Sequence, residues 1–314
     1  METVVFVLGY RARPFLEKGY FGSIKTAADQ LNSSRVVFLD NYSRDGTVQY
    51  LIDHHFDVDI LLSPRNYLYC KAINYGLQYI YHRYNPDYYI LVDADNPCKP
   101  DAYCQLVAYA KKYESAGMVQ PVVRKLQDES RLYSCGHYID EDYNCRTKKR
   151  IPDNVSELED LISCSISSTL IKKDVFLKCG LLDTRFEMYW ESMDLAYRAR
   201  RKGFKCACCL NASTYNEGGR LSEIDCFHER YYRVRNKIIF YWKNDKPTFD
   251  IVMRSLSKTL EDLNNKNNES EYGLSVVEEA TRQGIQDGIA QIHREGDFQP
   301  SITDFEKGNI IFIQ

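Results

Sequence analysis

The first 120 residues alternate between short apolar runs and stretches with helical spacing, and this alternation constrains the fold more than any other feature. Four runs are continuous and rich in β-branched or aromatic residues, which is typical of strands buried on both faces. These runs are residues 3–8, 35–39, 58–62 and 87–92, and the stretches with helical spacing are 15–31, 47–55 and 69–84. The pattern predicts an α/β fold with a Rossmann-like, mainly parallel central sheet flanked by helices. In such sheets, ligands bind beyond the carboxyl ends of the strands.

The composition is that of an ordinary globular protein, with 44% hydrophobic and 27% charged residues and a net charge of -3. This balance argues against bulk binding of nucleic acid, although it leaves room for a local basic patch. The N-terminus lacks the features of a signal peptide, and no stretch approaches the roughly 18 apolar residues of a membrane span. We therefore expect a cytoplasmic chain with no transmembrane segment, and leave open peripheral contact with the inner face of the membrane.

Eleven cysteines are scattered along the chain, and we expect them to be reduced. Cys206, Cys208 and Cys209 are close together but lack a second Cys or His pair at zinc-finger distance. We expect them to be small buried residues on a strand rather than metal ligands.

The stretch ILVDADNPCKPD at residues 90–101 carries the strongest chemical signal. A buried strand delivers Asp93 and Asp95 into a loop, where two carboxylates can share a divalent cation such as Mg²⁺ or Mn²⁺. The alternative is a solvated acidic turn that caps the next helix.

Two further stretches follow predicted strands. In VVFLDNYSRDGT, Asp40 leaves its strand close to where Asp93 leaves its own, and a carboxylate there can accept from a nucleobase or ribose. In RNYLYCKAINYGLQ, Asn66 and Lys71 lie at the start of a helix, where free N–H groups and a cation favour a diphosphate. The alternatives are an ordinary polar turn and an ordinary capped helix.

A charged helix is predicted in FEMYWESMDLAYRARRKGF, residues 186–204. Glu191 and Asp194 lie three residues apart and share a helix face, so either carboxylate is a candidate general base toward an acceptor hydroxyl. The alternative is a solvated helix laced with ion pairs.

Taken in order, these stretches resemble the inverting family 2 glycosyltransferases with the GT-A fold, and in particular their rhamnosyltransferase-like branch. The resemblance runs over residues 4–244 and includes YYRVRNKIIFYWKN near its end. The later stretch EEATRQGIQDGIAQIHREG also resembles the C-terminal segment of that branch.

The resemblance implies a nucleotide-sugar-dependent hexosyltransferase of glycan or polysaccharide assembly, with a UDP, dTDP or GDP donor and Mn²⁺ or Mg²⁺ as cofactor. It implies a hydroxyl acceptor on a glycan, a lipid-linked molecule or a peptide, and it leaves a homodimer open. By resemblance, Asp40 contacts the nucleobase, Asp93 and Asp95 serve the ribose and the metal, mainly through Asp95, and the segment around Glu191 supplies the base. The candidates for the nucleotide sugar are Gly9, Tyr10, Asp40, Asn66, Lys71, Asp93 and Arg235.

Two departures from the family pattern affect the expected chemistry. The family usually has Glu-Asp where this chain has Glu191-Ser192, and a serine cannot take the proton, so Glu191 or Asp194 must serve. The branch often has a His where this chain has Asn216. These departures favour one rival, a catalytically silent nucleotide-sugar-binding relative. Another rival, a nucleotidyltransferase, would need a Gly-rich loop after the first strand.

We divide the chain into a GT-A domain at 1–245 and a C-terminal helical extension at 246–314. Within the first, residues 1–120 form the nucleotide-sugar-binding half and 121–245 the acceptor-binding half. A polar break is predicted at 262–273, followed by a helix at 274–293. The tail beyond the break is predicted to be an accessory helical element that is not part of the sheet. Residues 211–221 are predicted to form a loop.

Overall fold

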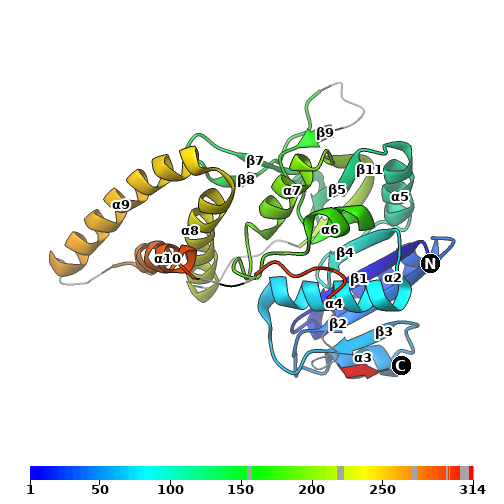
Figure 1. Cartoon of the computed structure of the whole chain (residues 1–314). Helices are drawn as coiled ribbons and strands as arrows, with labels where there is room; N and C mark the ends of the chain where they lie inside the picture. Colours follow the sequence, from blue (N-terminus) through cyan, green and yellow to red (C-terminus); the bar gives the residue numbers. More distant parts are fainter. Residues whose placement is uncertain are drawn as a thin grey trace.

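A mainly parallel sheet flanked by helices forms the centre of the computed structural model, as the N-terminal alternation predicts (Figure 1). The structure describes residues 1–153, 158–217, 223–269, 274–294, 296, 298–304 and 311–313. The strands are β1 Thr3–Gly9, β2 Ser34–Asp40, β3 Asp59–Leu62, β4 Tyr88–Asp93, β5 Ala116–Lys125, β6 Asp128–Ser134, β7 His137–Ile139, β8 Cys145–Thr147, β9 Leu158–Leu161, β10 Ser168–Lys172, β11 Lys205–Asn216 and β12 Ile311–Ile313. The helices are α1 Arg13–Glu17, α2 Tyr20–Asp29, α3 Thr47–Asp53, α4 Leu68–Tyr84, α5 Ala102–Lys112, α6 Lys173–Cys179, α7 Glu191–Arg201, α8 Glu223–Asn244, α9 Lys246–Glu269 and α10 Val276–Ile292.

The strand order is β12-β3-β2-β1-β4-β10-β5-β11-β9, with β6 paired to β5. The pairs β3-β2, β2-β1 and β1-β4 are all parallel, and Gly9 of β1 is in register with Asp40 of β2. Because side chains alternate along a strand, Val5 and Val7 of β1 face α2 and α5, whereas Val4 and Phe6 face α4. This double burial explains why the strands are continuous apolar runs rather than alternating ones.

Strand β10 runs antiparallel between β4 and β5, so it joins the two halves of the sheet. Strand β11 then pairs with β5 in parallel. Cys206, Cys208 and Cys209 lie on β11 and are buried, which confirms that they are core residues of a strand. The same strand continues to Asn216, so the loop predicted at 211–221 is wrong for its first six residues. Residues 218–222 lie outside the described part of the chain.

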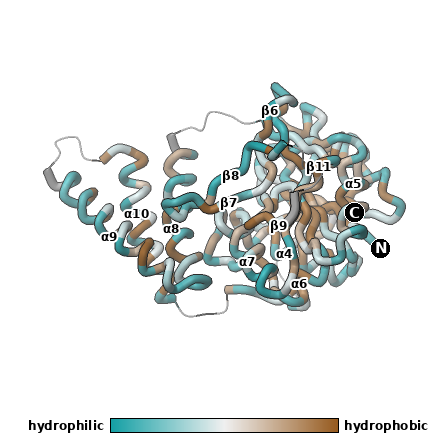
Figure 2. Tube along the Cα trace, turned by 90° about the horizontal axis from the view of Figure 1, so that it is seen from above, coloured by the Kyte–Doolittle hydropathy of each residue, from teal (hydrophilic) through white to brown (hydrophobic). Residues whose placement is uncertain are grey.

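Helices α8, α9 and α10 stand together at one side of the sheet (Figures 1 and 2). Gly284 and Gly288 of α10 allow a close approach to α8, because a Cβ at Gly284 would lie 2.7 Å from the carbonyl oxygen of Tyr231. The polar break is wrong for 262–269, because α9 continues to Glu269, and residues 270–273 lie outside the described part. An apolar stripe on α9 packs against the core and overrides the poor helix propensity of its asparagines; it comprises Phe249, Val252, Met253, Leu256 and Leu260.

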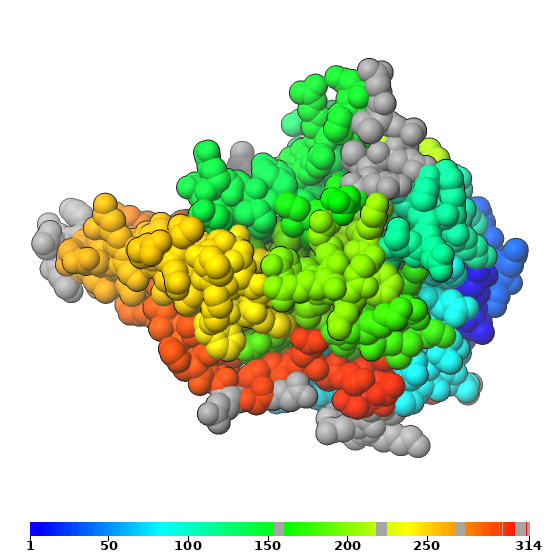
Figure 3. Space-filling view, turned by 45° about the horizontal axis from the view of Figure 1, so that its top comes forward, coloured from blue at the N-terminus to red at the C-terminus, as the bar shows by residue number. Residues whose placement is uncertain are grey.

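The C-terminal segment returns from α10 to the N-terminal half of the molecule (Figure 3). Its backbone pairs with the region after α6, since the N–H of Leu181 donates to the carbonyl of Pro300 at 3.0 Å. Gln78 of α4 donates to the carbonyl of Ser301 at 2.9 Å. Strand β12 then pairs antiparallel with β3 at the edge of the sheet. The prediction that the tail stays outside the sheet is therefore wrong, because its last strand covers an otherwise unpaired edge.

No helix in the described ranges is both long enough and apolar enough to cross a membrane.

Candidate active site

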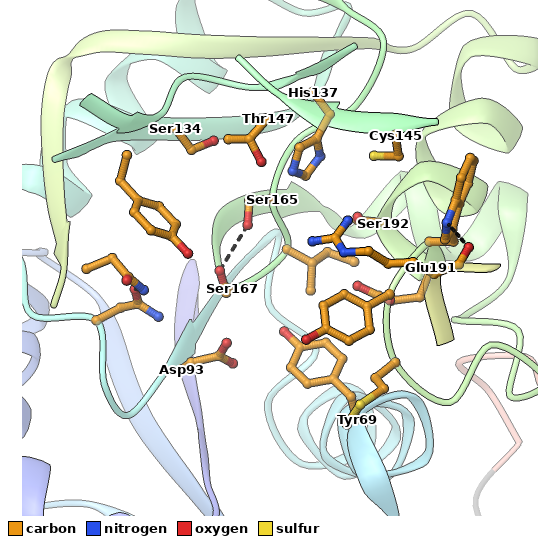
Figure 4. Close-up of a pocket in the computed structure, with 18 of the residues that line it drawn as sticks. Tyr69, Asp93, Ser134, His137, Cys145, Thr147, Ser165, Ser167, Glu191 and Ser192 are labelled. Atoms are coloured by element: carbon orange, nitrogen blue, oxygen red, sulfur yellow. Dashed lines mark hydrogen bonds between the residues drawn. The ribbon is translucent and has the colours of Figure 1, made fainter. Parts of the chain in front are cut away.

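A cavity of about 420 Å³ lies beyond the carboxyl end of β4 (Figure 4). In Figure 4, Asp93 and Tyr69 lie on one side of it, and Ser134, Thr147, His137 and Cys145 lie on the other. Its lining residues are Tyr69, Asp93, Asp95, Asn96, Tyr133, Ser134, His137, Cys145, Thr147, Ser165, Ile166, Ser167, Met188, Tyr189, Trp190, Glu191, Ser192, Asn216 and Arg233. The structure thus brings together three of the predicted carboxylates, Asp93, Asp95 and Glu191, from segments about 100 residues apart in the chain.

Asp93 and Asp95 lie where the sequence places them, at the end of β4. Burial and the neighbouring Asp95 raise the pKa of Asp93 well above its usual range, and burial also raises the pKa of Asp95. One carboxylate oxygen of Asp93, Oδ1, is buried and has no hydrogen-bond partner within the described ranges. Two crowded carboxylates with an unsatisfied oxygen fit a hard divalent cation, because a cation would relieve both the repulsion and the missing contact.

The described residues contain no group of three or more His, Cys, Asp or Glu side chains arranged to hold a metal ion. Asp93 and Asp95 would therefore form only part of a coordination shell, which suits a cation that also binds substrate oxygens. Asn216, at the position where a His was considered, lines the same cavity, and its amide donates to Oδ1 of Asn96 at 3.3 Å.

Asp40 ends β2 and Gly9 ends the adjacent strand β1, whereas Asp93 ends β4 on the other side of β1. The expectation that Asp40 and Asp93 leave neighbouring strands is therefore wrong. Asp40 is buried: its Oδ2 accepts from the N–H of Ser43 at 3.0 Å, and its Oδ1 has no partner. Burial raises its pKa. Tyr10, the residue after Gly9, is exposed. A buried acceptor without a partner at a strand end suits a polar ligand that can donate to it.

The start of α4 does not offer the free N–H groups that we expected. The N–H groups of Tyr69 and Cys70 donate to the carbonyl of Glu187 at 3.1 and 2.8 Å, and the N–H of Leu68 donates to Oδ1 of Asn66 at 2.8 Å. That part of the prediction is wrong, because a distant loop satisfies the helix terminus. Lys71 is exposed and lines a different pocket of about 270 Å³, beside Gln78 and Asp304.

Glu191 is the first residue of α7 and lies on the cavity wall. The residue is 9% exposed, and its Oε2 has no hydrogen-bond partner among the residues that the structure describes. Burial raises its pKa to about 7, even though nearby backbone N–H groups and Arg233 act in the opposite direction. A buried carboxyl with a free oxygen and a pKa near neutrality has the properties of a general base.

Asp194 is in a different environment, although it lies only three residues further along α7. It is fully buried and does not line the cavity. Its Oδ2 accepts from Nε of Arg198 at 2.8 Å, and its Oδ1 accepts from the amide of Asn244 at 3.0 Å and lies 2.9 Å from Nζ of Lys243. Burial alone would raise its pKa, but these partners together hold it below the usual range. Asp194 therefore has no free oxygen to offer a substrate.

The loop that presents Glu191 is strained and is held by α8. Glu187, Tyr189 and Trp190 all have φ angles between 59° and 68°, a region that costs non-glycine residues energy. The buried amide of Asn236 donates to the carbonyls of Phe186 and Met188, each at 2.7 Å. This contact with α8 fixes the position of the base, and the sequence alone gave no sign of it.

Arg233 occupies the place on the cavity wall for which Arg235 was the candidate. Arg235 is 5% exposed, and its Nη1 donates to the carbonyl of Arg185 at 2.7 Å. Arg233, in contrast, lies over the ring of Tyr189 and pairs with Glu229 at 2.8 Å. Both arginines belong to the RVRN sequence of α8, but Arg233 is the one that lines the cavity.

The remaining wall is neutral and polar, and sequence analysis missed most of it. His137 of β7 is half-buried; its Nδ1 atom is buried without a hydrogen-bond partner among the described residues, and burial, with nearby Arg233, lowers its pKa to about 4. Ser165 and Ser167 hydrogen-bond each other at 3.0 Å, as the dashed line in Figure 4 shows. Burial raises the pKa of Cys145 to about 12, so its thiol stays neutral. Hydroxyl groups and a neutral imidazole suit a neutral polyhydroxylated ligand.

The sequence was compared with protein-family models and with curated protein sequences. The model of the glycosyl transferase family 2 matches residues 22–178, which is half of the chain. A comparison with curated protein sequences gave no significant match.

Solved structures similar to this one include residues 1–349 of TarS from S. aureus, with a TM-score of 0.54 and 11% identity. That similarity covers 78% of this chain and 66% of the TarS fragment. Another is GalNAc-T7 with UDP, GalNAc and Mn²⁺, with a TM-score of 0.57 and 14% identity over 96% of this chain and 55% of that one. TarS 1–349 in complex with UDP-GlcNAc has a TM-score of 0.55 and 13% identity, covering 93% and 82%. The chain thus spans about two thirds of the first structure and just over half of the second, and these similarities confirm the GT-A fold.

Proposed function

Because the chain belongs to the family 2 glycosyltransferases, we propose that it transfers a sugar from a nucleotide-diphosphate-sugar donor to an acceptor hydroxyl. The observation that carries this proposal is Glu191, a buried carboxyl with a free oxygen and a pKa of about 7, in the same cavity as Asp93 and Asp95. Family membership and an intact candidate base favour an enzyme over a silent relative or a nucleotidyltransferase.

In the proposed reaction, Glu191 accepts the proton of the acceptor hydroxyl while that oxygen forms a bond to the anomeric carbon. The bond from the anomeric carbon to the donor diphosphate breaks on the opposite face, so the configuration inverts. Ser192 cannot replace the base, because a serine hydroxyl does not accept a proton near neutral pH. Asp194 is unsuitable because Arg198, Lys243 and Asn244 occupy its oxygens.

Asp93 and Asp95 are the residues that would hold a divalent cation, Mn²⁺ or Mg²⁺. When bound, such an ion supplies Lewis-acid stabilisation of the leaving diphosphate. Asp40, with its orphaned oxygen, is proposed to accept from the nucleobase. Solved relatives in complex with UDP and with UDP-GlcNAc support a UDP-type donor, with dTDP and GDP as the other candidates.

We keep the rhamnosyltransferase-like branch, a role in glycan or polysaccharide assembly, a cytoplasmic location and the domain division at residue 245 as proposals. They rest on the motifs of the sequence, above all the 186–204 and 231–244 stretches. The acceptor class among glycans, lipid-linked molecules and peptides, and a homodimer, are proposed on the same basis.

The test is incubation with UDP-, dTDP- and GDP-sugars and Mn²⁺, followed by measurement of nucleoside diphosphate release. We expect slow hydrolysis of one donor. Asp95→Ala should lower turnover by at least about a hundredfold, the scale expected when a main electrostatic stabiliser is lost. Asp174→Ala, which removes an exposed carboxylate on α6, is the matched control and should keep full activity.

Full activity of Asp95→Ala in EDTA would contradict the role of this residue. Exchange between the nucleotide sugar and added pyrophosphate would indicate a nucleotidyltransferase. Nucleotide-sugar binding without any turnover would indicate a silent relative.

A further inference from the structure

A strip of basic side chains runs along two grooves beside the catalytic cavity. The first groove, of about 610 Å³, shares Cys145, Thr147 and Arg233 with the cavity. The second, of about 580 Å³, shares Lys149 with the first. The cavity and the two grooves are therefore neighbours along β6, β7, β8 and α8. Figure 2 shows β7 and β8 between the sheet and α8.

The charge of this strip is opposite to that of the whole chain, which is -3. Eight basic residues line the two grooves: Arg124, Lys125, Arg131, Arg146, Lys149, Arg150, Arg230 and Arg233. Six acidic residues line the grooves, pair with these cations or act on them through space: Asp128, Asp140, Asp142, Asp153, Glu191 and Glu229. Lys125, Arg131 and Lys149 form no ion pair with any residue that the structure describes.

The cations near the first groove crowd one another. Burial and the nearby Arg146 lower the pKa of Arg230. Burial also lowers the pKa of Lys237 to about 8; Asp140 and Asp142 act against this shift, whereas Arg230 and Arg146 act with it. Like charges held together in this way cost free energy in the empty protein, and an anion placed among them would remove that cost.

We propose that this basic strip binds the acceptor, and that the acceptor is an acidic glycan with phosphate or carboxylate groups repeating along its chain. The proposal rests on the glycosyltransferase function proposed above. The guanidinium group of arginine pairs with phosphate and with carboxylate, so the strip would recognise the negatively charged oxygens that both groups carry. Because the first groove opens from the cavity wall at Arg233, an acceptor bound along the strip would place one end beside Glu191.

The shape of the strip favours a glycan chain over a membrane surface. The anionic groups would be spread over two connected hollows rather than over one flat face. A bilayer would also require apolar anchors beside the cations. The second groove offers few, because it is lined mainly by charged residues, with Leu132 and Ile151 as its apolar lining. The first groove has two exposed hydrophobic side chains, Tyr138 and Val277.

The test measures binding by calorimetry to four probes: an oligogalacturonate, a glycerol-phosphate oligomer, a neutral dextran oligomer, and vesicles containing phosphatidylglycerol. We expect the wild type to bind at least one acidic oligomer, more weakly at higher salt, and not to bind dextran. The two acidic probes show whether carboxylate or phosphate is preferred. Arg131→Glu with Lys149→Glu should raise the dissociation constant about tenfold, because each exposed ion pair contributes modestly.

The matched control is Arg254→Glu with Lys258→Glu, which makes the same charge change on exposed positions of α9 outside the grooves and should bind as the wild type does. Acceptor-independent donor hydrolysis should be unchanged in both double variants. Equal binding of dextran, equal binding by the Arg131 and Lys149 variant, or binding to vesicles alone would overturn the proposal. Failure of the proposed function would look different: the wild type would hydrolyse no donor and yet still bind acidic oligomers.

Discussion

The two ends of the first turn of α7 place carboxylates in opposite environments. Glu191 lies on the cavity wall with an unpartnered oxygen, and burial raises its pKa to about 7. Asp194, three residues later, is enclosed by Arg198, Lys243 and Asn244, and its pKa is held below the usual range. Both are almost fully buried, so burial alone does not separate a reactive carboxylate from a structural one. The supply of partners separates them.

This comparison also explains why the strained loop before α7 is tolerated. The ion cluster at Asp194 fixes α7 to α8 through Lys243 and Asn244, and Asn236 of α8 holds the loop at 186–188. The cluster and the loop contacts therefore keep Glu191 in a place where no group in the described part of the chain hydrogen-bonds its Oε2. On this account, the partners of Asp194 supply stability, and the lack of partners at Glu191 supplies reactivity.

The largest expected effect is on turnover. Glu191→Gln should keep the fold and the affinity for donor but lower kcat by about 10²–10⁴-fold, the usual range for loss of a general base. Steady-state kinetics at pH 8 with saturating donor, beside circular dichroism of the same sample, measure this. If Glu191→Gln stays active while folded Asp194→Asn is inactive, the two roles are reversed.

Next in size is the stability of the ion cluster. Asp194→Asn should lower the free energy of unfolding by about 3–5 kcal/mol, because Arg198 is left as a buried cation without a carboxylate and Lys243 loses one of its two. Urea unfolding at pH 7 measures this change. Asp174→Asn, on the surface of α6, should change stability by less than about 0.5 kcal/mol. A stability for Asp194→Asn equal to that of the wild type would show that the cluster does not hold α7 in place.

The smallest effect has the opposite sign. The pKa of Glu191 is about 7 in the folded chain, against an ordinary value of 4.5, so ionising it costs stability as pH rises through this range. Glu191→Gln, which cannot ionise, should be more stable than the wild type by up to about 3 kcal/mol at pH 8 and similar to it at pH 4.5. Urea unfolding in the absence of ligands at both pH values measures the difference. A constant difference between the two pH values would mean that Glu191 has a normal pKa.

Much of the fold could be predicted from local patterns. Strands buried on both faces read as continuous apolar runs, so β1 to β4 and the acidic pair after β4 were found correctly. The predicted break is wrong for 262–269, where α9 continues, because the apolar stripe earlier in α9 stabilises the helix through this polar stretch. Strand β12 was also missed, because three residues at the end of the chain gain their structure only from pairing with β3.

The candidate site was predictable where one strand or helix turn decides the geometry, as for Asp93 and Glu191. It was not predictable where contacts cross 40 residues or more. The choice of Arg233 over Arg235 depends on how α8 packs, and the indole N–H of Trp190 donating to the carbonyl of Arg233 at 3.1 Å is part of that packing. His137 and Cys145 reach the cavity from a hairpin whose sequence carries no chemical motif.

The most direct test of Glu191 as the base is the pH dependence of kcat, measured at saturating donor and acceptor for the wild type and for Glu191→Gln. We predict that kcat of the wild type falls about tenfold per unit below pH 7 and levels off above it, because only the ionised carboxylate accepts the proton. The residual rate of Glu191→Gln should lack this inflection, although Asp93 and Asp95, whose pKa values are also raised, remain in that variant. A flat wild-type profile, or the same inflection in Glu191→Gln, would contradict the assignment.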